Sequence, residues 1–144
     1  MREFVLVLFF ALIIFGCNSS SENSETVKNE EELIMAPRSE MAILMNEMYA
    51  FNESIKEQII SGELNNDFPD NFNKIQTAVL TKPSVRDAAF ESYSSDFISK
   101  TKNVFETPHD NLVDRYNEAV NSCISCHNDK CVGPIPRIKK LLIQ

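Results

Sequence analysis

The sequence has little glycine and no segment with the pattern of a β-strand. Only three of its 144 residues are glycine, and no run alternates between apolar and polar residues as a strand would. Apolar residues instead recur at three- and four-residue steps, which is typical of helices that bury one face. These absences argue against a sheet fold, and the spacing predicts an all-α fold.

Positive charge and long apolar runs are also scarce. The sequence has 14 Lys and Arg residues and 21 Asp and Glu residues, which gives a net charge of −7. Nucleic acid and anionic membrane surfaces repel an acidic protein, so we expect neither as a partner. The acidity either steers a basic protein partner to the chain or simply confers solubility. No apolar stretch is long enough to span a bilayer stably.

The N-terminus has the pattern of an export signal. Arg2 precedes a nearly unbroken apolar run over residues 4–15, which is the length of a signal-peptide core. The run ends in Ile14-Phe15-Gly16-Cys17, which resembles the lipobox of bacterial lipoproteins. This resemblance implies cleavage before Cys17, with lipid on its thiol and amine. An uncleaved N-terminal anchor and an ordinary cleaved signal are the alternatives.

Three parts of the chain follow from this pattern. We expect residues 1–16 to be the signal peptide, and residues 17–37 to be the lipidated cysteine with a flexible, polar tether. Residues 38–144 then form the folded domain. Its predicted helices cover residues 39–61, 69–80, 84–105 and 107 to about 129, with Ser84 and Thr107 as N-caps. Helices joined by short breaks favour an antiparallel four-helix bundle.

The last predicted helix carries Cys123-Ile124-Ser125-Cys126-His127. Two thiols three residues apart, followed directly by a histidine, have the spacing that attaches a c-type haem. On a helix, Cys123, Cys126 and His127 share one face. Each thiol can add across one haem vinyl group while His127 binds the iron. The single motif therefore predicts one haem c per chain.

Three other interpretations of the motif stay open at this point. A Cys-x-x-Cys pair can be a redox dithiol, although that site usually follows a strand. A zinc site needs four ligands, for which Cys131 and His109 are the only extra candidates of their types in the domain. A chain without haem would be an interaction protein of the cell envelope.

The fourth cysteine has no partner within the chain if the other three are used. Lipid would occupy Cys17, and haem would occupy Cys123 and Cys126. Cys131 is then buried, free, or paired with another molecule, which leaves a homodimer open.

With this order of segments, residues 39–130 resemble the class II cytochromes c, the family of cytochrome c′. The family is a four-helix bundle with Cys-x-x-Cys-His on its last helix and the sixth-ligand position on its first. That position is often followed by a methionine three residues later. Met45 and Met48 have this spacing, so the resemblance implies that Met45 is the sixth ligand. The alternatives are Met48, Met41, His109, a vacant position, and methionines that only pack against the haem.

The sequence departs from the family at two positions that often carry a basic residue. Met41 occupies the position four before the ligand, and Cys131 occupies the position four after the haem histidine. Lys130 and Arg137 are candidates to neutralise the haem propionates instead, as is Lys139. The alternative for all three is an ordinary solvated charge. The segment after residue 130 contains Gly133-Pro134-Ile135-Pro136, and we expect it to fold back over the haem edge or the bundle end.

The expected function is that of a lipid-anchored monohaem cytochrome. It would carry single electrons between redox proteins on the extracytoplasmic side of a bacterial cell envelope, and it would not be an enzyme. Histidine–methionine ligation fills the iron and raises its reduction potential, which favours electron transfer. The alternative is a five-coordinate haem that binds nitric oxide or another small gas. Peroxidase chemistry needs an open iron position and acid–base help, and Glu47 is expected to face outward.

Overall fold

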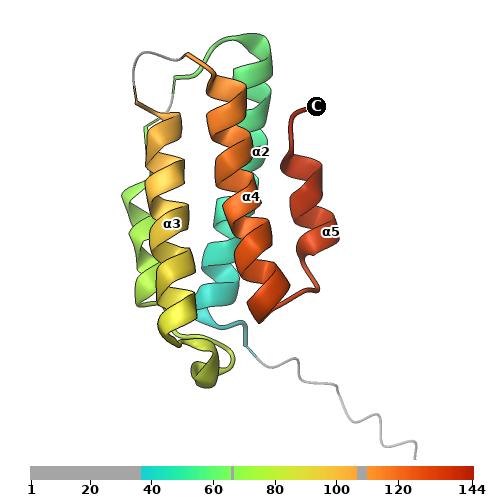
Figure 1. The fold of residues 1–144 in the computed structure, drawn as a ribbon. Helices are drawn as coiled ribbons and strands as arrows, with labels where there is room; N and C mark the ends of the chain where they lie inside the picture. The colour runs from blue at the N-terminus through green and yellow to red at the C-terminus, as the bar shows by residue number, and fades with distance from the viewer. Residues whose placement is uncertain (1–36, 66, 107–109) are drawn as a thin grey trace, which may run out of the picture. The chain divides into compact units, whose positions relative to one another are not determined.

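The computed structural model describes residues 37–65, 67–106 and 110–144, which belong to one unit. Within these residues the fold is all-α, with no strand, as the spacing predicted (Figure 1). None of the helices in the described part is long and apolar enough to cross a membrane. The predicted signal peptide, the lipidation site Cys17 and the alternative ligand His109 lie outside the described residues.

Helix α2, Glu40–Ser61, has the ends that the sequence predicted. The Ser39 hydroxyl accepts a hydrogen bond from the Ala42 backbone N–H at 3.2 Å. Such a cap satisfies one of the amides that a helix start leaves without a partner. At the other end Gly62 takes the left-handed conformation with φ 79°, and its N–H bonds to the last carbonyls of the helix. Glycine adopts this conformation without steric cost.

The predicted second helix, residues 69–80, is wrong in type and length. The segment forms a 3₁₀-helix, η1, over Asp70–Gln76. The side-chain amide of Asn73 donates to the Asp70 carbonyl at 3.0 Å. Asn and Asp side chains compete in this way with the α-helical backbone ladder, which explains the tighter and shorter element.

Helix α3, Ala88–Val104, begins later than predicted. A 3₁₀ turn, η2, covers Pro83–Val85, so Ser84 is not the N-cap. Asp87 takes that role, and its carboxylate accepts from the Phe90 N–H at 2.8 Å. Phe90 and Phe97 of this helix are buried, whereas Ala88 and Ala89 in its first turn are exposed. The buried face of α3 comprises Phe90, Ser94, Phe97, Thr101 and Val104.

Helix α4, Leu112–Lys130, ends where the sequence predicted but starts later, after Asn111. Asn111 has φ 55°, a left-handed conformation that Asn tolerates better than most residues. The predicted cap Thr107 lies outside the described residues. After α4 the chain turns into a short helix, α5, Ile135–Ile138, and a 3₁₀ turn, η3, Lys139–Leu141.

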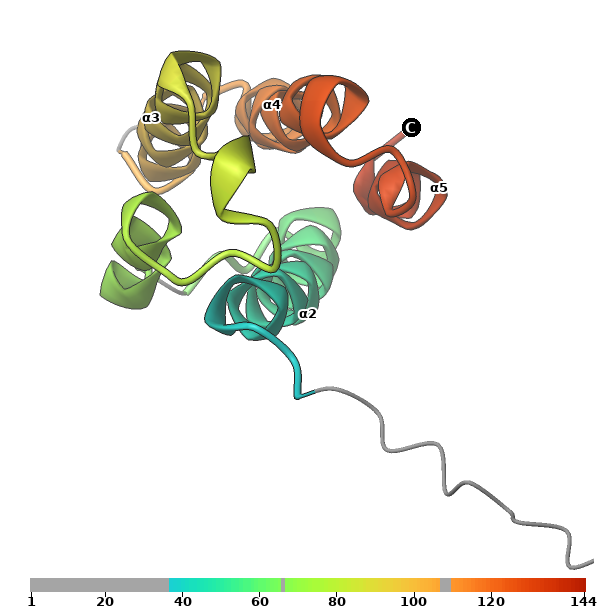
Figure 2. The ribbon, with the colours of Figure 1, turned by 90° about the horizontal axis from the view of Figure 1, so that it is seen from below.

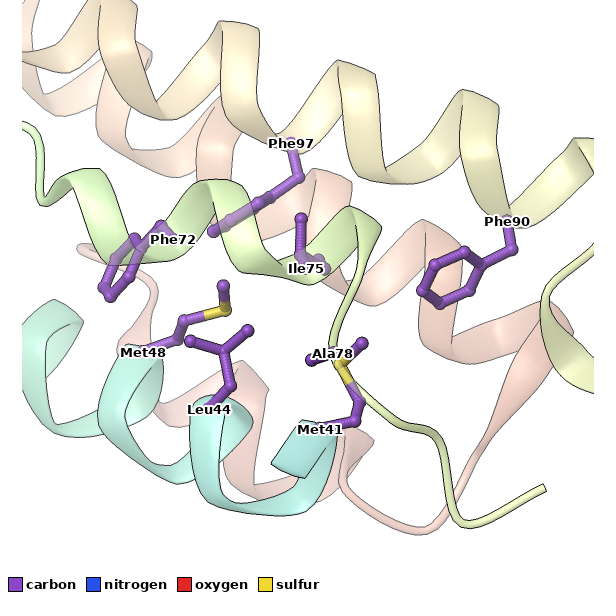
Figure 3. Packing of buried hydrophobic residues seen from close by; sticks show 8 residues of the cluster. All are labelled: Met41, Leu44, Met48, Phe72, Ile75, Ala78, Phe90 and Phe97. Carbon is purple, nitrogen blue, oxygen red and sulfur yellow. The ribbon is translucent and has the colours of Figure 1, made fainter. Parts of the chain in front are cut away.

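Helices α3 and α4 lie side by side, and α2 lies beside η1 (Figures 1 and 2). The segment with α5 and η3 packs against α4 and α2, on the side away from α3 (Figure 2). Two groups of buried side chains form the core. The first joins α2, η1 and α3 (Figure 3) and comprises Met41, Leu44, Met48, Phe72, Ile75, Ala78, Phe90 and Phe97. The second joins α2, the end of α3, α4 and the C-terminal turns and comprises Ile55, Ile59, Val104, Tyr116, Ala119, Val120, Ile138 and Leu141.

Candidate functional site

A cavity of about 560 Å³ lies between residues of α2, α4 and the C-terminal turns. Cofactor pockets usually enclose roughly 300–1,000 Å³ and are mostly apolar with a few polar groups. The cavity has this character, because most of the surface that lines it is apolar and a few polar and charged side chains also reach it. Its lining includes all three residues of the haem motif, Cys123, Cys126 and His127. It also includes all three candidate methionines, Met41, Met45 and Met48.

The haem motif occupies the last two turns of α4. Cys123, Cys126 and His127 are each half-buried and line the same cavity, as their helical spacing predicted. Cys123 packs against both core groups, and its thiol lies 3.5 Å from the Ala119 carbonyl one turn earlier. The two thiols and the imidazole therefore line one cavity from a single helix.

The His127 ring is oriented by the backbone that follows it. Its Nδ1 lies 2.9 Å from the Cys131 carbonyl oxygen. A carbonyl can only accept, so Nδ1 carries the proton and donates. In the neutral imidazole this leaves the Nε2 lone pair free to bind a metal. Metal-binding histidines usually have their other nitrogen held in this way, which fixes both tautomer and ring orientation.

Burial raises the pKa of both motif thiols. The pKa of Cys123 rises to about 12, mainly through desolvation and then through the nearby Cys126. The pKa of Cys126 rises to about 11, again mainly through desolvation. A redox dithiol needs a thiol that ionises easily, with a lowered pKa. The environment therefore disfavours the dithiol interpretation and suits thiols whose sulfur ends in a neutral covalent bond.

The three methionines of α2 differ in how they meet the cavity. Met41 and Met48 are 6% and 5% exposed and point toward η1 and α3, among the first core group (Figure 3). Met45 is only half-buried and packs at the edge of that group. The α2 residues along the cavity run from Met41 to Asn52, and Met45 falls in the middle of that stripe. Of the three side chains, that of Met45 is the least buried in the core.

Charged residues along the cavity are all cationic, although the chain is acidic. They are Lys82, Lys130 and Arg137. The ammonium of Lys130 lies 2.8 Å from Asp87 and 2.9 Å from Asp129, and hydrogen bonds to these carboxylates raise its pKa. Arg137 donates to the Asn46 side chain at 3.0 Å. Sequence reasoning missed Lys82, which no motif marks and which the loop after η1 brings to the cavity.

The zinc interpretation finds no support in the described residues. No three His, Cys, Asp or Glu side chains of the described ranges lie close enough together to hold a metal ion. Cys131 is exposed and lines the cavity, and its carbonyl, not its thiol, meets His127. No protein family, curated protein or solved structure matches the chain.

Proposed function

We propose that the protein is a monohaem c-type cytochrome that carries single electrons. One observation supports this proposal above the others: Cys123, Cys126 and His127 line one apolar cavity with Met45, and His127 presents a free Nε2. The residues fit a haem c, because the cavity offers two thiols for covalent attachment, one imidazole, one thioether and a wall of apolar side chains.

In this proposal each thiol adds its S–H bond across one vinyl double bond of the haem, so no atom is lost. Cys123 and Cys126 would thereby hold the haem, and Nε2 of His127 would be one ligand to its iron. Met45 of α2 would supply the second protein ligand. When bound, the haem iron takes up and releases one electron, and a histidine–methionine pair raises its reduction potential. The apolar part of the wall would limit the water around the haem, so less solvent would have to reorganise when the charge changes.

The surrounding fold and location belong to the same proposal. We propose that α2, η1, α3 and α4 follow an antiparallel four-helix plan in which η1 replaces the second helix, as in class II cytochromes c. Lipid on Cys17 would hold the domain at the extracytoplasmic side of a bacterial membrane, where confinement raises the effective concentration of redox partners. The protein would be a carrier and not an enzyme. Among the described residues along the cavity there is no Asp or Glu, and His127 is the one histidine.

Absorption spectra of the full chain, expressed with a haem-attachment system, test the proposal. We expect a reduced c-type spectrum and, in the ferric protein, the weak thioether–iron band at roughly 700 nm. Met45→Ala should abolish this band and allow carbon monoxide to bind. Met48→Leu is the matched control, because Met48 lies in the core, and it should keep the band.

Two results would contradict the proposal in different ways. A colourless protein despite working attachment machinery would exclude the cytochrome. A coloured wild type that binds carbon monoxide freely and has no thioether band would keep the haem but replace electron transfer with the gas-binding alternative.

A further inference from the structure

We infer that the C-terminal segment, residues 132–144, is a positioning element that holds α2 at a fixed separation from α4, and so sets the distance between Met45 and His127. The roles of Met45 and His127 as ligands rest on the proposed function. The contacts of the segment do not depend on it.

The segment is attached to α2 at two places. The Lys56 ammonium donates to the backbone carbonyls of Lys140 and Leu142, both at 2.8 Å. The second attachment is about two helical turns nearer the start of α2. There the Arg137 guanidinium lies 3.6 Å from the centre of the Tyr49 ring and donates to the Asn46 side chain at 3.0 Å. Stacking of a guanidinium on an aromatic ring adds to the hydrogen bond. Asn46 directly follows Met45, so this attachment lies beside the proposed ligand.

The same segment is attached to α4. The Asn117 side chain donates to the Ile143 carbonyl at 2.8 Å and accepts from the Ile143 N–H at 2.9 Å. Ile138 and Leu141 are buried in the second core group with Tyr116 of α4 and Ile55 of α2. The segment therefore contacts both helices through hydrogen bonds and through apolar burial.

The cavity is the reason that α2 and α4 need such a connection. Met45 and His127 both line it, so the cavity lies between α2 and α4 at that level. Pro134, Arg137, Ile138 and Leu141 also line the cavity. The C-terminal segment thus forms one wall of the cavity and joins the two helices on either side of it.

A looser segment should let α2 move, and Met45 would then leave the iron more often. Carbon monoxide binds only to an iron position that Met45 has left, so its association rate reports how often the ligand departs. The carbon monoxide association rate therefore tests whether the segment holds Met45 in place, without any redox partner.

The experiment compares Arg137→Ala and Lys56→Met with wild type, all as full-length, haem-bearing protein. Lys56→Met removes the donor but keeps an apolar stem of similar length. Lys139→Ala is the control. Lys139 was also a candidate for the propionates, but the structure leaves it exposed on the same segment and outside the cavity. We expect each of the first two variants to raise the carbon monoxide association rate about tenfold, equivalent to ~1.4 kcal/mol, and the control to match wild type.

Hydrogen exchange provides a second measurement that does not depend on the iron ligand. Amides of residues 41–49 should exchange faster in Arg137→Ala and Lys56→Met, while those of α3 stay as in wild type. Equal exchange and equal carbon monoxide rates in all variants would overturn the inference. If wild type binds carbon monoxide freely, Met45 is not a ligand and the proposed function fails, and the exchange measurement alone then decides whether the segment holds α2.

Discussion

Tyr116 makes a direct polar link between α4 and α2, and Tyr116→Phe tests what this link contributes to stability. The side chain is 1% exposed and belongs to the second core group. Its hydroxyl donates to the Asn52 backbone carbonyl at 2.8 Å. Phenylalanine keeps the ring and its packing and removes only the hydroxyl. The measured change therefore isolates one buried hydrogen bond between the two helices.

The expected loss is about 1 kcal/mol in the free energy of unfolding, which is typical for one buried hydrogen bond. A larger loss is not expected, because Asn52 lies inside α2 and its carbonyl keeps a second donor in the helix ladder. For a domain of this size, about 1 kcal/mol lowers the melting temperature by roughly 4 °C. Urea denaturation of the full chain, followed by far-ultraviolet circular dichroism, measures the difference.

Tyr93→Phe is the matched control. Tyr93 is a half-buried tyrosine on α3 that lies outside both core groups, and the same change there should cost less than about 0.5 kcal/mol. The reasoning is refuted if the two variants lose the same stability, because the Tyr116 hydroxyl would then contribute no more than a partly solvated one.

Two further predictions concern the cavity. The first concerns haem-free protein whose thiols are kept reduced. Folding raises the pKa of Cys123 to about 12 and that of Cys126 to about 11, against an ordinary 9.0. As pH rises, the unfolded chain therefore loses these two protons before the folded chain does. The free energy of unfolding should then fall as pH rises from about 9 to about 12, by up to ~1.4 kcal/mol per pH unit for each thiol. Urea titrations across this range should show no such fall from these residues in a Cys123→Ala/Cys126→Ala variant or after haem attachment. The second prediction concerns Lys82. Redox titration of the haem-bearing protein should show that Lys82→Ala lowers the reduction potential by on the order of tens of millivolts, since losing a nearby cation favours the ferric form. Lys74 is on η1 and outside the cavity, so Lys74→Ala should leave the potential unchanged.

Local signals in the sequence were enough to predict α2 and the end of α4. Ser39 and Gly62 are a cap and a stop whose effect depends on neighbours a few residues away. The one-face arrangement of Cys123, Cys126 and His127 likewise follows from helical geometry alone. The all-α class could accordingly be predicted from the sequence. That the motif and the methionines of α2 line one cavity was implied only by the resemblance to class II cytochromes c.

The features that sequence reasoning missed depend on distant partners. Asp87 replaces Ser84 as the cap of α3, and its carboxylate also pairs with Lys130 on α4, 43 residues away. Lys56 and Arg137 find their partners 84 to 91 residues away. No local pattern encodes such pairs. The 3₁₀ form of η1 was missed for a different reason, because its apolar spacing fits either kind of helix and its Asn and Asp residues decide between them.

The acceptor of the hydrogen bond that orients His127 is the main-chain carbonyl of Cys131 and not its thiol. Nearly any residue at that position supplies the same backbone carbonyl, so the orientation of the imidazole does not depend on which amino acid is there. Proline is the exception, because the Cys131 N–H also bonds back to the His127 carbonyl at 3.0 Å and proline has no such hydrogen. A basic residue at position 131 would leave the orientation of the ring unchanged and would add a cation at the edge of the cavity, which Cys131 lines.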